Sequence, residues 1–320
     1  MLSEEHLIAH LKQAFPQCIG DDAAVLPRLP EGQWVVTKDI LVEQVHFRRR
    51  YTPPEALAHK ALHVNLSDLA AMGATPQYIL LGLSLPLTLE DAWMGAFLDA
   101  FCAVCRDARV ILVGGDTTAA AGDDLYISIT AMGVVEPLQL KTRSKGRPHQ
   151  VIALAGELGH AHLGLSALES GWDGLDDFKQ AFLRPRARVE EGQWLGHEPS
   201  VKAMMDTSDG LFIDLTRLCQ ASGVGAVLEL EGIPCKATFK SACAQFNLDP
   251  RVVQLSGGED YGLLIAVDEE AYPNLSHRFA KKFGYALIQL GQLTEGHEIR
   301  LLEQGAPVTL ALQLFSHFKA

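Results

Sequence analysis

Segments of strand length alternate with segments of helix length along almost the whole chain. The strands are expected at residues 34–41, 78–85, 110–113, 125–135, 151–155, 203–205, 225–230 and 261–267. The helices are expected at residues 54–71, 92–109, 189–195, 210–221, 236–246 and 269–283, with additional helix before residue 168. Because strands that alternate with helices pack as sheets covered by helices, this pattern predicts an α/β (α+β) fold.

A polar segment at residues 140–149 divides the pattern into two halves. It carries five basic groups together with Gly146 and Pro148, a composition typical of a linker. A length of 320 residues also suits two domains of roughly 150 residues each. We therefore predict an N-terminal domain at residues 1–140 and a C-terminal α/β domain at residues 148–320.

Charge and hydropathy exclude two classes of partner. The chain has 27 basic and 39 acidic side chains, and it lacks the basic stripe with which proteins follow nucleic acids. Its longest apolar run, at residues 78–85, is far shorter than the ~18 residues that a membrane-spanning helix needs. The first residues do not resemble a signal peptide. A cytoplasmic protein is expected, without nucleic-acid or membrane partners.

Two pairs of possible metal ligands fall on expected helices. Cys102 and Cys105 form a C-x-x-C, but no second pair or suitably spaced histidine lies near them. Buried helix packing is therefore favoured over a zinc or redox role. His59 and His63 are likewise interpreted as structural.

Aspartates recur next to strand ends and glycines. Those singled out are Asp21, Asp22, Asp39, Asp68, Asp116, Asp206 and Asp209. One such residue is usually a helix cap or a solvent-facing side chain. A group of carboxylates that converges is stable only when a cation neutralises it, and hard divalent cations prefer oxygen ligands. The pattern therefore predicts a magnesium cluster.

Glycines accompany three of the acidic segments. Gly114-Gly115-Asp116-Thr117-Thr118 is expected to link two strands, Asp206-Thr-Ser-Asp-Gly210 joins a strand to a helix, and Ser256-Gly-Gly-Glu-Asp260 precedes a strand. Glycine lets backbone N–H groups approach a ligand closely, and a helix N-terminus favours anions. Phosphate binding and ordinary tight turns both explain this pattern. No P-loop sequence is present.

Seven segments occur in an order that resembles the thiamine-monophosphate kinases, which belong to the superfamily of aminoimidazole ribonucleotide synthetase. They are Gly20-Asp-Asp-Ala-Ala-Val25 and the segments at 42–47, 60–74, 114–118, 183–185, 206–210 and 256–261. The resemblance implies the two-domain ATP-binding fold of this superfamily, with an N-terminal mixed sheet that pairs across a homodimer. It also implies direct in-line transfer of the γ-phosphoryl group of ATP to thiamine monophosphate, which gives thiamine diphosphate.

The resemblance assigns roles residue by residue. It implies magnesium ligation by Asp22, Thr37, Lys38, Asp39, Asp68, Asp116, Asp206 and Asp209. It implies nucleotide contacts from Gly115, Asp116, Arg143 and Ser208, and substrate contacts from His46, Glu259 and Phe318. No catalytic base is expected, because the attacking phosphate is already anionic and catalysis rests on positioning and charge neutralisation. A monovalent cation is left open.

Departures from the family pattern leave alternatives open. Lys38 stands where threonine is usual, which is harmless if this residue ligates through its carbonyl but removes a ligand if a hydroxyl is needed. The alternatives are another enzyme of the superfamily (aminoimidazole ribonucleotide synthetase, selenophosphate synthetase or a hydrogenase-maturation protein) and a non-catalytic nucleotide sensor. The adenine pocket and the roles of Arg184 and Arg188 are not predicted.

Overall fold

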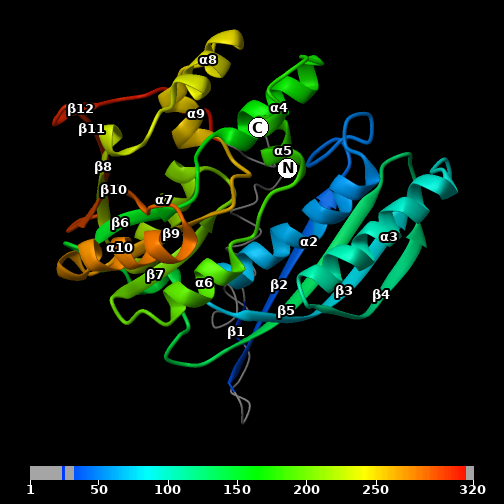
Figure 1. Cartoon of the computed structure of the whole chain (residues 1–320), viewed down its shortest axis with the longest axis horizontal. Helices are drawn as coiled ribbons and strands as arrows, with labels where there is room; N and C mark the ends of the chain where they lie inside the picture. Colours follow the sequence, from blue (N-terminus) through cyan, green and yellow to red (C-terminus); the bar gives the residue numbers. More distant parts are fainter. Residues whose placement is uncertain (1–23, 26–31, 315–320) are drawn as a thin grey trace.

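The computed structural model describes residues 24–25 and 32–314. Two sheets lie side by side, and helix α2 (Pro54–Ala71) lies between them (Figure 1). Pro54 occupies the first turn of α2, where its fixed φ suits a helix and its missing N–H costs nothing. The core runs along α2, because Leu57 and Leu62 pack with the first sheet while Ala70 and Ala71 pack with the second.

The N-terminal sheet has the strand order β1-β2-β5-β3-β4. Its strands are β1 (Ala24–Val25), β2 (Gln33–Val42), β3 (Thr75–Leu85), β4 (Ile111–Ala119) and β5 (Tyr126–Val135). The sheet is mixed, since β3 and β4 run parallel and the other described pairs run antiparallel. Helices α2 and α3 (Asp91–Asp107) cover one face, where Phe97 and Phe101 are buried.

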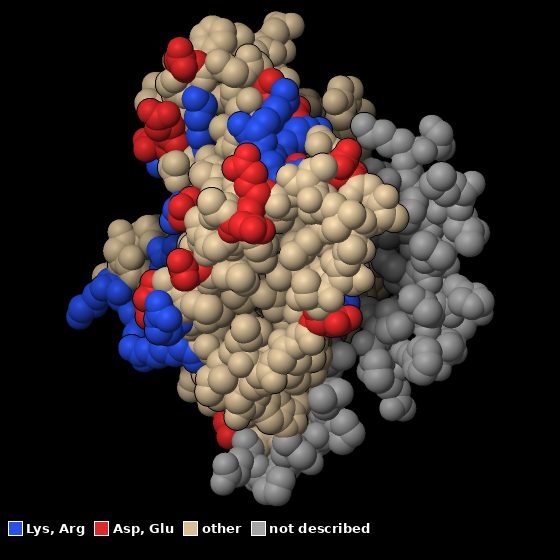
Figure 2. Space-filling model, turned by 90° about the vertical axis from the view of Figure 1, so that its right-hand side faces the viewer, with Lys and Arg blue, Asp and Glu red and all other residues tan. Residues whose placement is uncertain are grey.

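The other face of this sheet stays open to solvent along the described strands. Ile40, Leu80 and Tyr126 are 50%, 38% and 40% exposed there, and every residue of β4 is exposed. Figure 2 is turned toward the β4 and α3 side and shows a broad area without charged side chains in its middle. An open sheet face that exposes several large apolar side chains is typical of an interaction surface.

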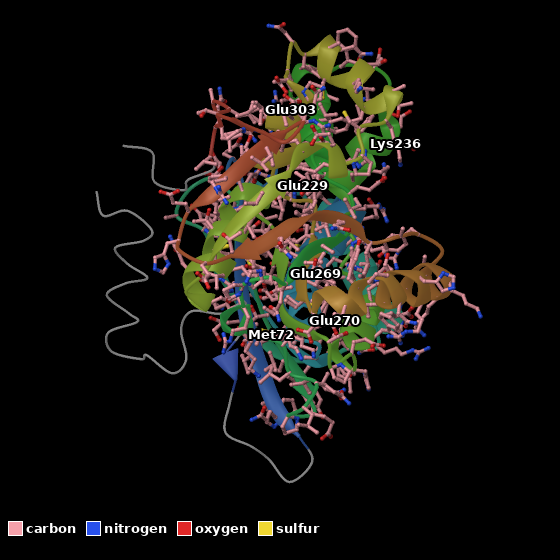
Figure 3. The ribbon with its side chains drawn as sticks, turned by 90° about the vertical axis from the view of Figure 1, so that its left-hand side faces the viewer. Met72, Glu229, Lys236, Glu269, Glu270 and Glu303 are labelled. Carbon is pink, nitrogen blue, oxygen red and sulfur yellow. The ribbon has the colours of Figure 1, made fainter. Side chains whose placement is uncertain are left out.

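The C-terminal sheet has the order β12-β11-β8-β10-β6-β9-β7. Its strands are β6 (Val151–Ala155), β7 (Val201–Thr207), β8 (Gly225–Glu229), β9 (Gly262–Val267), β10 (Ile288–Thr294), β11 (Ile299–Glu303) and β12 (Ala306–Val308). Residues of β6, β7 and β9 contribute to two separate apolar clusters, so both faces of the sheet are buried at these three strands. Glu229 and Glu303, on the neighbouring strands β8 and β11, are exposed on the side drawn in Figure 3.

Helices and short 3-10 turns complete the structure. The helices are α4 (His160–Ser170), α5 (Asp176–Leu183), α6 (Val189–Gly196), α7 (Leu211–Ser222), α8 (Ala237–Gln245), α9 (Pro250–Ser256) and α10 (Tyr272–Phe283). The 3-10 turns are η1 (Arg143–Lys145), η2 (Leu230–Gly232) and η3 (Glu269–Ala271). No helix in the described part of the chain is both long and apolar enough to cross a membrane.

The predicted alternation of strands and helices is confirmed, but the connection predicted at residues 114–116 is wrong. Residues 114–116 lie inside β4, because Gly114 and Gly115 continue the parallel ladder opposite Leu80 and Leu81. The short apolar run at 110–113 marked only the beginning of this strand. Helices α5 and α9 and strands β10 to β12 were not predicted.

The two residue pairs on helices differ in outcome. Cys105 is buried as expected, but Cys102 is exposed, so packing inside a core is wrong for it. The His59 and His63 rings stack with their centroids 3.9 Å apart. Burial lowers the pKa of His59 to about 4 and that of His63 to about 3, so both rings are neutral at pH 7.

A glycine on α6 allows this helix to approach α2 closely. A Cβ added to Gly192 would lie 2.2 Å from the carbonyl oxygen of Ala70. Gly192→Ala should therefore lower the free energy of unfolding by about 2 kcal/mol, as overpacking of a core does. Gly95→Ala on α3 is the matched control, since nothing lies within 4 Å of its Cβ. In urea unfolding, the Gly95→Ala variant should gain roughly 0.5 kcal/mol in its free energy of unfolding. Equal changes in the two variants would contradict the packing argument.

Candidate active site

A cavity of about 560 Å³ opens between the two sheets. It is lined by the end of β2, one side of α2, the end of β7 and the segment that precedes β9. Its acidic lining residues are Asp39, Asp68, Asp206, Asp209 and Glu259. A larger hollow of about 1160 Å³ lies beside the 140–149 segment but contains none of the predicted site residues. The smaller cavity is therefore the candidate active site.

The N-terminal half supplies two carboxylates and a hydroxyl. Side chains alternate along β2, so Thr37 and Asp39 lie on the face that packs against α2. The Thr37 hydroxyl donates a hydrogen bond of 2.5 Å to Asp68 Oδ2 on α2. The backbone N–H of Asp39 donates to Asn65 Oδ1 at 3.0 Å, which fixes the strand against the helix at this point.

The C-terminal half brings two further carboxylates to the same cavity. Asp206 is only 2% exposed and accepts a 2.6 Å hydrogen bond from the Ser67 hydroxyl on α2. Asp209 pairs with Arg217 on α7 at 2.5 Å. The side chain of Asp214 accepts from the N–H groups of Asp209 and Gly210, both at 3.1 Å. These bonds hold the turn between β7 and α7 in one conformation.

The acids that share the cavity affect one another electrostatically. Burial, followed by the charge of Asp209, raises the pKa of Asp39 to about 6. A divalent cation would favour the ionised form of Asp39, and Mg²⁺ takes oxygen ligands from a few carboxylates and keeps several waters. Among the described residues, no three acidic, histidine or cysteine side chains converge closely enough to hold one ion by themselves. The carboxylate oxygens of the cavity are ligands of the type that Mg²⁺ accepts.

Lys38 and Asp116 lie on the opposite, open face of the N-terminal sheet. Lys38 Nζ donates to the Ser128 hydroxyl at 2.6 Å, so its ammonium does not enter the acidic cavity. Asp116 shares a row across the sheet with Ser128 and Ile40. It lines a second hollow of about 520 Å³ on this face. The structure therefore does not bring Asp116 together with the four cavity aspartates.

Gly115 has a structural reason to be glycine. A Cβ at this position would lie 1.9 Å from the carbonyl oxygen of Leu81 on the paired strand. The close approach belongs to strand pairing, so the glycine by itself does not indicate a ligand.

The remaining predicted residues take different places. His46 and Ser208 line the cavity, and His46 Nδ1 accepts a 3.0 Å hydrogen bond from the Val42 N–H. Arg143 lies in η1, which packs against β7 and α7 outside the cavity lining, and its carbonyl accepts from the Ser222 hydroxyl. Asp22 and Phe318 lie outside the described residues.

The cavity lining is partly apolar. Val45, Leu165, Phe182 and Leu314 belong to it, as does Glu259. Glu259 and Tyr261 both have positive φ angles, of 70° and 48°. Their N–H groups donate to the carbonyls of Ser208 and Thr207 at 2.7 and 2.9 Å, which hold this segment against the end of β7.

Sequence reasoning missed two residues that shape the site. Asn65 and Ser67 lie beside the predicted Asp68 on α2, and they contact Asp39 of β2 and Asp206 of β7. Their polar side chains in an otherwise apolar helix were the available signal. Asp260 instead supports α4, because it accepts from the N–H groups of Gly159 and Ala161, and burial raises its pKa to about 7.

Known proteins are similar to this chain in sequence and in fold. Residues 20–135 match the family described as AIR synthase related protein, N-terminal domain, and residues 147–303 match AIR synthase related protein, C-terminal domain. The chain is 34% identical to the thiamine-monophosphate kinase of Haemophilus influenzae, over 94% of this chain and 91% of that protein. It is 35% identical to the thiamine-monophosphate kinase of Escherichia coli K12, over the same shares.

Solved structures extend the similarity to three dimensions. "AaThiL complexed with AMPPCP and TMP" is 29% identical, covers 99% of this chain and 97% of its own, and superposes with a TM-score of 0.87. The hydrogenase maturation protein HypE of Escherichia coli superposes with a TM-score of 0.75 over 97% of this chain. At 23% identity, the latter match shows a shared fold alone.

Proposed function

Because the chain belongs to the family of thiamine-monophosphate kinases, we propose that it transfers the γ-phosphoryl group of ATP to thiamine monophosphate. The observation that carries this proposal is a cavity whose lining combines four aspartates with Glu259 and several apolar side chains. The similar structure with bound AMPPCP and TMP supports both substrates. We also propose a cytoplasmic location for this ATP-consuming enzyme.

The cavity aspartates are proposed to hold magnesium. Asp39, Asp68, Asp206 and Asp209 would provide oxygen ligands, with Asp22 and the oxygens of residues 37 and 38 completing the set. Bound magnesium would neutralise the charge that two polyanionic substrates bring together. The chain itself contributes positioning: Ser67, Asn65 and Thr37 fix the acidic segments, so little reorganisation remains when the substrates bind.

No general base is proposed. The acceptor is a phosphate whose attacking oxygen is already anionic near pH 7, so alignment and charge neutralisation dominate the barrier. The nucleotide is assigned to Ser208 in the cavity, and the thiamine part to His46, Glu259 and Phe318. The other predicted nucleotide residues do not line this cavity in the same subunit, because Gly115 and Asp116 lie in β4 and Arg143 lies in η1. Because the side chain of Lys38 lies on the open face, the backbone carbonyl of this residue is the group proposed to ligate a metal.

A homodimer is proposed through the open face of the N-terminal sheet. Ile40, Leu80 and Tyr126 are exposed on this face, and a second copy of the sheet would cover them. Asp116 lies on the same face, so the partner sheet would enclose the hollow that it lines. Domains are proposed as 1–140 and 148–320, with the segment between them as linker.

Product identification tests the proposed activity. The protein is incubated with ATP, magnesium and thiamine monophosphate, each omitted in turn, and products are identified by phosphorus NMR. Thiamine diphosphate and ADP should form together in the complete mixture alone. Tight ATP binding without any thiamine diphosphate would support the non-catalytic sensor instead.

Removal of magnesium should abolish turnover. Four carboxylates around two polyanions repel the substrates unless cations are present, so excess EDTA should lower the initial rate by at least ~100-fold. Added Mg²⁺ should restore the rate. Full activity in EDTA, with metal content checked by mass spectrometry, would contradict the magnesium assignment.

A further inference from the structure

Lys60 is a buried cation at the edge of the candidate active site. Its side chain on α2 is 0% exposed, and its ammonium pairs with the carboxylate of Glu259. Nζ also lies 3.6 Å from the centre of the Phe182 ring and 3.4 Å from the Phe182 carbonyl oxygen. Burial lowers the pKa of Lys60 and the Glu259 charge opposes that shift. A lysine this deeply buried is costly unless it is paired, so its position requires an explanation.

The contacts of Lys60 join parts of the chain that are far apart in sequence. Lys60 belongs to the helix that covers the N-terminal sheet, whereas Phe182 ends α5 and Glu259 precedes β9. Both partners line the cavity, but Lys60 is not part of the lining. It therefore supports two walls of the cavity from behind.

The two supported groups have complementary chemistry. A carboxylate that gives one oxygen to Lys60 keeps further acceptor capacity on its other oxygen, which suits an aromatic amine such as an aminopyrimidine. An aromatic ring such as Phe182 packs favourably against a planar heteroaromatic group. A cation–π contact on one side of the ring restrains its position.

We propose that Lys60 is a positioning residue for the acceptor end of the site. It orients the Glu259 carboxylate and the Phe182 ring for the thiamine part of the substrate, and it does not contact the substrate itself. This inference rests on the proposed kinase function. It places the effect of Lys60 on acceptor recognition, since the side-chain contacts of its ammonium are with Glu259 and Phe182.

The test is a Lys60→Met variant compared with Lys141→Met. Lys141 is the matched control, because it is also buried, at 5% exposed, and its ammonium donates to the carbonyls of Glu198 and Val201 outside the active-site cavity. KM for thiamine monophosphate should rise by about 10-fold or more in Lys60→Met, the loss expected when a charged hydrogen bond no longer orients its partner. KM for ATP should change by less than ~2-fold in both variants.

A purely structural lysine would give a different result. Both variants would then lose thermal stability to a similar extent, while KM for thiamine monophosphate stayed at the wild-type value in each, and this outcome would overturn the proposal. If Lys60→Met does not fold, Phe182→Leu replaces it, since that variant keeps the ion pair and removes the ring. A several-fold rise in KM for thiamine monophosphate with unchanged KM for ATP is expected there, and an unchanged KM for both substrates would overturn the proposal.

The proposed function and this inference fail in distinguishable ways. If the wild-type protein forms no thiamine diphosphate, the kinase assignment is wrong whatever the variants do. If the wild type is active and Lys60→Met binds thiamine monophosphate normally, only the role of Lys60 is wrong. Isothermal titration with thiamine monophosphate alone provides a readout that does not depend on turnover.

Discussion

Asp206→Asn is expected to lower turnover by roughly 1,000-fold at saturating ATP, thiamine monophosphate and magnesium. Asparagine keeps the volume of the side chain and an acceptor for the Ser67 hydroxyl, but it removes the negative charge that would bind a cation. Because the amide keeps an acceptor for the Ser67 hydroxyl, the free energy of unfolding without metal should fall by no more than about 1 kcal/mol.

Measurements on one control variant separate this result from general damage. Asp268→Asn removes a carboxylate that pairs with Lys202 at 3.0 Å outside the active-site cavity, and it should retain near-normal turnover. Magnesium binding, followed by titration calorimetry in the presence of a non-hydrolysable ATP analogue, should weaken in Asp206→Asn alone. A variant with normal turnover would remove Asp206 from the metal assignment.

Leu80→Arg should convert the proposed homodimer into a monomer. Leu80 lies in the open face of the N-terminal sheet, between Thr130 of β5 and Gly114 of β4. An unpaired guanidinium buried in an apolar interface costs several kcal/mol, roughly 3 kcal/mol in each subunit. Light scattering should report a mass near 34.8 kDa for the variant and near twice that value for the wild type.

The matched control changes an equally exposed leucine on the other side of the sheet. Leu98 on α3 is 41% exposed, compared with 38% for Leu80, but it belongs to the helix that covers the opposite face. Leu98→Arg should remain dimeric and active. Dissociation of both variants, or of neither, would argue against the open sheet face as the dimer interface.

The sequence predicted the fold well where the pattern was periodic. The long helix at 54–71 and the strands at 34–41, 78–85 and 125–135 follow from apolar runs of the proper length, and the structure confirms them. The strand at 111–119 was cut short because two glycines and an aspartate resemble a turn, whereas pairing with β3 extends it. Local chemistry cannot reveal a partner strand that lies some 30 residues away.

The sequence allowed the acidic residues of the candidate site to be predicted, but not the residues that hold them in place. Strand-end aspartates pointed to a shared cavity, and the structure places Asp39, Asp68, Asp206 and Asp209 around one. Asp116 is separated from the cavity aspartates because its side chain lies on the other face of the sheet. The predicted strand ended before Asp116, so the prediction could not assign this residue to a face. The pairing of Lys60 with Glu259 spans 199 positions, so no local pattern could indicate it.

The position of α2 has a consequence for how the protein unfolds. Its first turns complete the core of one sheet and its last turns complete the core of the other, and the carbonyl of Met72 just beyond its end accepts from the Lys141 N–H of the linker. Unfolding of either half would therefore expose apolar surface of the other half to water. Although the chain matches two family descriptions, it should behave in calorimetry as one cooperative unit, with a single heat-absorption peak. In a fragment that ends in the linker, the apolar side of α2 that packs against the second sheet would be exposed to water. Such a fragment should aggregate rather than fold.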